Sequence, residues 1–133
     1  MAIPDASTPR SAGRRWVRTG PFSTRRIRAL FLTKAADAST TAIGLLFLSL
    51  TEGNPVIRRL VHGIGVVPGV VVASVLGIGV VVGVTELGVW AIAYAMVDRR
   101  WVRLVRTLGY GIPSTLWAVV SVHNAALIVA TVV

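Results

Sequence analysis

Apolar residues gather along the chain in three long runs that are nearly free of charge. The runs cover residues 29–51, which contain Lys34 and Asp37, residues 63–97, which contain Glu86, and residues 107–133, which contain no charged residue. About 20 apolar residues span the hydrocarbon core of a bilayer, so each run is long enough to cross a membrane. No run has the alternation of polar and apolar residues that marks a β-barrel strand. The pattern predicts an all-α integral membrane protein with transmembrane helices at about 29–50, 63–97 and 109–132.

The second run is longer than one perpendicular crossing requires. As a helix it would measure about 52 Å at 1.5 Å per residue. Two short helices there would make four spans and would move the basic residues at 99–106 to the other side of the membrane. We therefore predict one span from about residue 63, with an interfacial extension that carries Glu86, Trp90 and Tyr94.

The basic residues predict the orientation of these spans. Arg10, Arg14, Arg15, Arg18, Arg25, Arg26 and Arg28 precede the first run, and four more Arg residues separate the second run from the third. Basic residues next to spans stay on the cytoplasmic side. We therefore expect three crossings with the N-terminus inside and the C-terminus outside, in a multi-pass protein of the cell membrane. Arg58, Arg59 and His62 would lie outside, against this bias.

Composition narrows the class of protein. The 133 residues are 54% apolar and 14% charged, whereas a soluble domain carries about 25% charge. The net charge of +9 sits beside the spans, which argues against nucleic acid as a partner. The chain has no Cys and so no disulfide framework.

Two segments outside the spans differ from each other. Residues 1–22 carry Pro, Ser, Gly and Arg without apolar periodicity, which predicts a disordered basic tail before a helical membrane domain at 23–133. Residues 98–108 place Trp101, Leu104 and Leu108 on one face, which is typical of an interfacial amphipathic helix. We expect its basic residues to contact anionic lipid headgroups; they are Arg99, Arg100, Arg103 and Arg106.

Small residues indicate how the spans could associate. Membrane helices pack through close backbone approach and interhelical hydrogen bonds. The second run carries small residues at four-residue steps, first Gly65, Gly69, Ala73 and Gly77, then Gly79 and Gly83, and together they would form a shallow ridge. The third run aligns Ser114, Trp117, Ser121 and Asn124, whose polar groups could bond across helices.

Asp37 is the first candidate for a functional role, because a carboxylate in hydrocarbon is costly. Lys34 lies three residues earlier on the same face, with Thr40 and Thr41 following, so a local ion pair is available and is the simpler interpretation. Proton or cation handling is the alternative. Glu86 could pair with Lys34, but contact with water near the interface is the favoured reading.

The polar residues between the first two runs, Glu52, Asn54 and Pro55 among them, predict a turn from which a helix could start. His62 and His123 fall in the same half of the protein as Glu52. Their spacing matches no zinc motif, so we expect neither a metal site nor a cofactor.

The pattern of Asp37 with Thr40 and Thr41, then Glu52-x-Asn54-Pro55, then Asn124 resembles a family of small prokaryotic membrane proteins that carry a domain of unknown function. The resemblance covers about residues 30–133. It implies a compact membrane domain of three or four spans, with characteristic polar positions at Asp37, Thr41, Glu52, Asn54 and Asn124. It implies no activity.

These observations favour a small non-enzymatic membrane protein, an accessory or interaction subunit that forms a homo-oligomer or joins a larger membrane complex. One alternative is a homo-oligomeric transporter or channel lined by Asp37, Thr41 and Asn124. Another is an intramembrane enzyme, although no Ser stands beside a base at helical spacing, and we assign no catalytic residue.

Overall fold

The computed structural model describes residues 24–48, 50–95 and 98–133. Four helices make up this part of the chain: α1 (Thr24–Phe47), α2 (Pro55–Ile64), α3 (Val66–Tyr94) and α4 (Arg99–Val132). The described residues contain no strand, which confirms the all-α class. Among them, α1, α3 and nearly all of α4 are long and apolar enough to cross a membrane.

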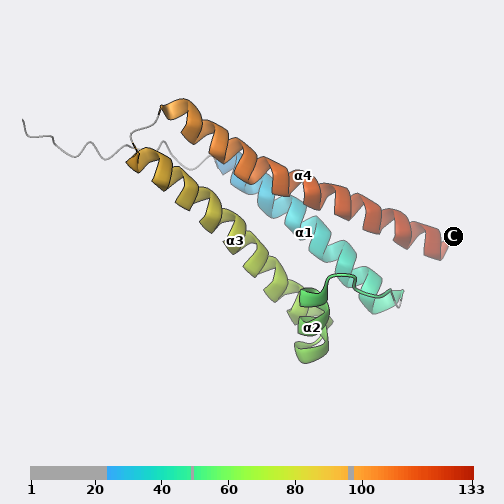
Figure 1. The fold of residues 1–133 in the computed structure, drawn as a ribbon. Helices are drawn as coiled ribbons and strands as arrows, with labels where there is room; N and C mark the ends of the chain where they lie inside the picture. The colour runs from blue at the N-terminus through green and yellow to red at the C-terminus, as the bar shows by residue number, and fades with distance from the viewer. Residues whose placement is uncertain (1–23, 49, 96–97) are drawn as a thin grey trace, which may run out of the picture.

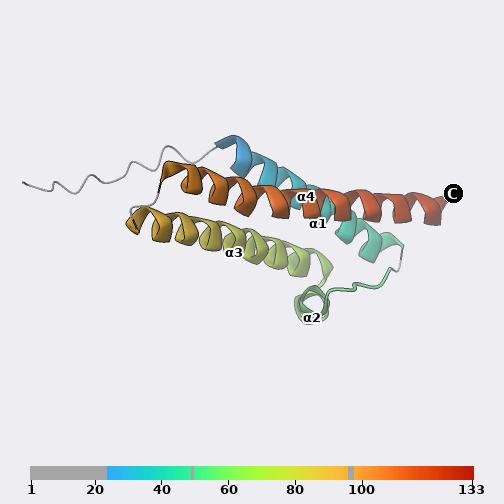
Figure 2. The same cartoon turned by 45° about the horizontal axis from the view of Figure 1, so that its top comes forward.

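The three long helices lie side by side and contact one another (Figures 1 and 2). Helices α1 and α4 run in the same direction, and α3 runs the opposite way (Figure 1). The start of α1 and the α3–α4 connection therefore share one end of the bundle, while the α1–α2 connection and the C-terminus share the other. Two long helices, α1 and α3, separate the Arg residues at the start of α1 from those at the start of α4, so both groups lie at the same end of the bundle, as the prediction of three spans requires.

Helix α2 is an element that the sequence prediction missed. Asn54 caps it, since the Oδ1 of Asn54 accepts a hydrogen bond from the Val56 N–H at 2.9 Å, and Pro55 occupies the first turn. Gly65 separates α2 from α3 with a φ of 93°, a conformation that favours glycine. The second span thus begins at Val66 instead of residue 63.

Helix α4 also differs from the prediction of an interfacial helix followed by a separate span. It is continuous over 34 residues, with Asp98 as its N-cap and Pro113 in its interior. Proline removes one backbone hydrogen bond and presses on the carbonyl four residues earlier, here that of Gly109. Contacts of Arg106 and Tyr110 with α3 hold the first half of α4 against the bundle, so residues 99–108 form one helix with the apolar segment that follows.

The remaining boundaries shift by a few residues. Helix α1 starts at Thr24, before the predicted residue 29, because Arg residues favour helix as well as apolar ones do. Helix α3 ends at Tyr94, and residues 96–97 of the predicted extension lie outside the described residues. The predicted tail, residues 1–22, lies outside them too.

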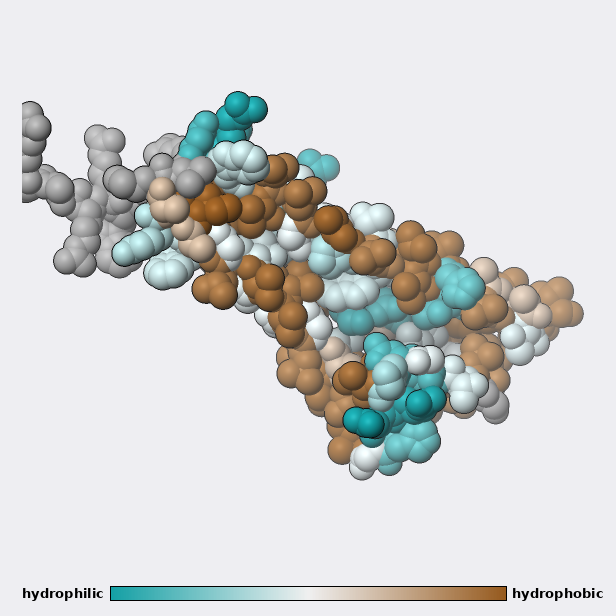
Figure 3. Space-filling model, viewed as in Figure 1, coloured by the Kyte–Doolittle hydropathy of each residue, from teal (hydrophilic) through white to brown (hydrophobic). Residues whose placement is uncertain are grey.

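The surface of the bundle is largely apolar. Among the described residues the buried apolar side chains are Leu30, Val70, Val89 and Tyr110, while Val and Leu residues along all three long helices are exposed. Figure 3 shows apolar residues along these helices and hydrophilic residues gathered over α2. Soluble monomers rarely expose such continuous apolar surface, so this distribution fits a helical bundle in contact with lipid.

Candidate functional site

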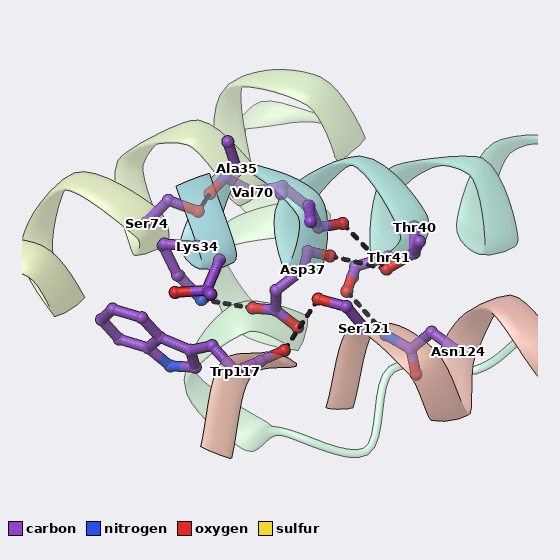
Figure 4. Close-up of polar contacts among 12 residues, drawn as sticks. Lys34, Ala35, Asp37, Thr40, Thr41, Val70, Ser74, Trp117, Ser121 and Asn124 are labelled. Carbon is purple, nitrogen blue, oxygen red and sulfur yellow. Dashed lines mark hydrogen bonds and ion pairs between the residues drawn. The ribbon is translucent and has the colours of Figure 1, made fainter. Parts of the chain in front are cut away.

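The candidate polar residues of α1 begin with a buried ion pair (Figure 4). Lys34 Nζ lies 2.6 Å from Asp37 Oδ2, and both side chains are 9% exposed. The same ammonium lies 4.9 Å from the centre of the Trp117 ring on α4. The local pair that the spacing made available is therefore present, and a cation–π contact joins it to α4.

The hydroxyl groups near Asp37 do not bind its carboxylate. Thr40 Oγ1 donates to the backbone carbonyls of Ala36 and Asp37, at 3.1 Å each. Thr41 instead accepts a hydrogen bond from Asn124 Nδ2 at 3.2 Å, which connects α1 to α4. Such interhelical bonds contribute about 0.6 kcal/mol on average in membrane proteins.

The serines of the predicted α4 stripe bond within their own helix. Ser114 Oγ donates to the Tyr110 carbonyl and Ser121 Oγ to the Trp117 carbonyl, both at 2.7 Å. Of the polar residues expected to bond across helices, Asn124 does so. The serines satisfy their hydroxyl groups locally, as is common in apolar helices.

Glu52 and Asn54 organise the connection between α1 and α2. Glu52 Oε1 accepts a hydrogen bond from the Asn54 N–H at 2.7 Å, and Asn54 caps α2. Glu52 also lines a pocket of about 330 Å³ together with Thr41 and Asn124. Three of the five candidate polar residues thus meet at one pocket. Asp37 lies one helical turn from Thr41, and Asn54 faces α2.

A second polar cluster joins α3 to α4 and was missed by the sequence analysis. Arg106 Nε and Nη2 donate to the Glu86 carboxylate at 3.2 and 2.9 Å, and Tyr110 Oη donates to Glu86 Oε1 at 2.8 Å. Glu86 therefore pairs with Arg106. The sequence analysis had offered Lys34 as a partner and had favoured contact with water. The i, i+4 spacing of Arg106 and Tyr110 could have indicated this cluster, because it puts both side chains on one face of a helix.

This cluster changes the prediction that all four Arg residues at 99–106 contact lipid headgroups. Arg100 and Arg103 are exposed, in keeping with contact to lipid headgroups, and the side chain of Arg99 lies outside the described part. Arg106 differs from the expected headgroup contact, because it is 8% exposed and forms part of the helix interface.

The small residues of the predicted ridge face several directions. A Cβ added to Gly69 would lie 2.8 Å from the Val61 backbone N, so Gly69 permits the approach of α2, which is not a span. Gly77 faces Trp117 and Lys34 at about 4 Å, while a Cβ at Gly79 or Gly83 would meet nothing within 4 Å. Ala73 is half-buried, and Gly65 provides the turn before α3.

The closest approach of α3 and α4 depends on a glycine outside that ridge. A Cβ added to Gly109 would lie 2.7 Å from Thr85 Cγ2 and closer still to Thr85 Oγ1. Thr85 itself is buried. The pair was not visible in the sequence, because Gly109 and Thr85 lie on different helices and Gly109 has no small residue four positions before or after it to form a ridge.

The two histidines do not come together with carboxylates. His62 is exposed on α2, with its Nδ1 2.7 Å from the Arg58 carbonyl, and His123 is exposed on α4. Within residues 24–48, 50–95 and 98–133 no group of three His, Cys, Asp or Glu residues could hold a metal ion.

Comparison of the chain with protein-family models, with curated proteins and with solved structures found no match. The resemblance to the small prokaryotic membrane proteins therefore stays a prediction.

Proposed function

We propose that this protein is a small non-enzymatic membrane protein, an accessory or interaction subunit of the cell membrane that assembles with a second copy of itself. The observation that carries the proposal is the internal pairing of charge. Lys34 pairs with Asp37, and Glu86 pairs with Arg106. The Glu86–Arg106 pair joins α3 to α4, and the Lys34 ammonium of the other pair contacts Trp117 on α4. These charged groups would have to break their ion pairs to act on a substrate.

The assembly surface is the outer face of α3. Gly79 and Gly83, one turn apart, are exposed and have open space above them. Exposed Leu76, Val80 and Leu87 flank them. A ridge of small residues between larger apolar ones allows another helix to approach closely, and this approach provides the dispersion contacts that drive association in lipid.

Disulfide crosslinking in proteoliposomes tests this assembly directly. The chain contains no Cys, so a single introduced Cys reports on one position. Val80→Cys on the ridge should crosslink two copies, while Val129→Cys on α4 should not. Adding Gly79→Leu and Gly83→Leu to Val80→Cys should abolish the crosslink.

Gly111 offers a matched control, because it is exposed on α4 with nothing within 4 Å of an added Cβ. Gly111→Leu should leave the Val80→Cys crosslink intact. Equal loss of crosslinking in the Gly111→Leu protein, or no crosslink at Val80→Cys in the parent, would contradict assembly through α3.

A homo-oligomeric transporter or channel is the second candidate. It is supported by the place of the buried Asp37, one turn from Thr41 and from the pocket that Thr41 shares with Asn124. Intramembrane carboxylates next to polar cavities mark ion and proton pathways in other proteins.

A further inference from the structure

We infer that the pocket at the end of α1 binds a primary ammonium group attached to a short apolar chain. The pocket lies between the C-terminal part of α1, the loop that follows it and α4, and measures about 330 Å³. This volume is in the range of small-molecule sites, which begin at about 300 Å³. The inference does not depend on assembly through α3, because α3 contributes no residue to the lining.

The charge of the pocket selects a cation. Glu52 lines it, and the described lining residues include neither Lys nor Arg. Glu52 Oε1 is held by the Asn54 N–H, whereas Oε2 has no hydrogen-bond partner among the described residues. The C-terminus of α1 adds the partial negative charge of a helix dipole.

Two further polar side chains of the wall, Asn124 and Thr40, keep an oxygen that can accept a hydrogen bond. Asn124 donates through Nδ2 to Thr41, while its Oδ1 accepts no hydrogen bond from the described residues and is not fully buried. Thr40 uses its hydroxyl proton on the backbone carbonyls of Ala36 and Asp37, so its oxygen lone pairs stay available. An ammonium group has three donors, which Glu52, Asn124 and a Thr oxygen could accept.

The other residues of the pocket wall favour an organic cation over a metal ion as the ligand. Leu45, Leu50, Val120 and Leu127 provide an apolar lining beside the acceptors. Calcium prefers six to eight oxygen ligands, often several of them carboxylates, and Glu52 is the one carboxylate in the described lining. Apolar walls next to a single carboxylate favour an alkylammonium ion. Its ammonium group pairs with the carboxylate, and its alkyl chain is removed from water against the apolar walls.

A primary ammonium can come from a free amine or from the headgroup of a phospholipid such as phosphatidylethanolamine. The pocket lies where α1 ends, so either source could reach it. Titration calorimetry with n-butylammonium as the probe, on the full chain in nanodiscs of phosphatidylcholine and phosphatidylglycerol, tests the site. The protein should bind n-butylammonium, and n-butanol should not compete.

Glu52→Gln should weaken n-butylammonium binding by about tenfold, or about 1.4 kcal/mol, because it removes the charge and keeps the shape. Asp98→Asn is the matched control: it also removes one carboxylate that accepts a backbone N–H, but at the opposite end of the bundle, and should bind like the parent. Circular dichroism of both variants checks that the helices are intact.

Nanodiscs that contain phosphatidylethanolamine distinguish the two sources. Competition by this lipid would assign the site to a headgroup, and unchanged affinity would assign it to free amines. The inference is overturned if n-butylammonium does not bind the parent protein in phosphatidylcholine and phosphatidylglycerol, or if folded Glu52→Gln binds it as tightly as Asp98→Asn does.

Discussion

At the scale of single residues, α1 buries two charged side chains and pairs them with each other. Lys34 and Asp37 neutralise each other over 2.6 Å, and Trp117 covers the ammonium. Removing one member of a buried pair leaves the other charge in a poor environment. Removing both members can be nearly neutral, because the cost of burying the charges disappears with their attraction.

Asp37→Asn should therefore lower the free energy of unfolding by about 3 kcal/mol, since Lys34 loses its partner. The double variant Lys34→Met with Asp37→Asn should recover most of this loss. Unfolding by SDS in mixed micelles measures both, with Ser39→Ala on the exposed side of α1 as a control that changes little. A double variant less stable than Asp37→Asn would contradict the pairing as the role of Asp37.

The same Asp37→Asn variant separates the structural role from transport. In reconstituted vesicles the proposed accessory protein should conduct neither protons nor alkali cations, with or without Asp37. A flux in the parent protein that Asp37→Asn abolishes, while the helices stay folded, would favour the transporter instead.

At the scale of elements, the register of α3 against α4 is set by a glycine facing a threonine. Gly109 leaves room for the buried Thr85. Directly beside this contact Glu86, the residue after Thr85, bonds Arg106 and Tyr110, which lie three residues before and one residue after Gly109. A shift of α4 along α3 would break all of these contacts at once. The helix pair is thus specified by a small residue and a polar cluster acting in the same register.

Gly109→Ala should destabilise the protein by about 1–3 kcal/mol, because the new methyl group overlaps Thr85. Combining it with Thr85→Ala, which removes the overlapping Oγ1 and Cγ2 atoms, should recover part of the loss. Gly111→Ala, two residues along the same helix and facing open space, should be neutral or should stabilise by up to about 1 kcal/mol. Equal effects of Gly109→Ala and Gly111→Ala on unfolding would rule out a close α3–α4 contact at Thr85.

At the scale of the whole molecule, the helix directions make the bundle asymmetric in charge. Exposed Arg100 and Arg103 lie at the end where α4 begins, together with the Arg residues that start α1, while α2 carries Arg58 and Arg59 at the opposite end (Figure 1). The larger basic group favours the cytoplasmic side. We therefore propose that the α1–α2 connection, and the pocket beside it, face outward.

Single-cysteine labelling in intact cells checks this orientation. Ala95→Cys, between α3 and α4, should be protected from a membrane-impermeant maleimide until the cells are opened, and Thr51→Cys should react at once. Both positions are exposed, so accessibility within the fold does not limit labelling. Reaction of the two positions from the same side would contradict the three-span arrangement.

The sequence by itself determined the all-α class, the presence of three helices long and apolar enough to cross a membrane, and the local ion pair. Long apolar runs that are nearly free of charge are typical of membrane helices or a buried core, and Lys34 and Asp37 are near neighbours on any helix. Asn54 and Pro55 also contained the start signal of a helix, but the apolar run that begins at residue 63 concealed the end of α2 at Gly65.

The tertiary structure alone decided the rest, because it depends on which faces of distant helices meet. Glu86 lies twenty residues from Arg106, and Thr41 lies further still from Asn124, so helical periodicity could not pair them. The glycines of α3 look alike in the sequence, yet Gly69 faces α2 while Gly79 and Gly83 face outward. Helix rotation and register, set by the sum of all interhelical contacts, made that distinction and brought Thr41, Glu52 and Asn124 to one pocket.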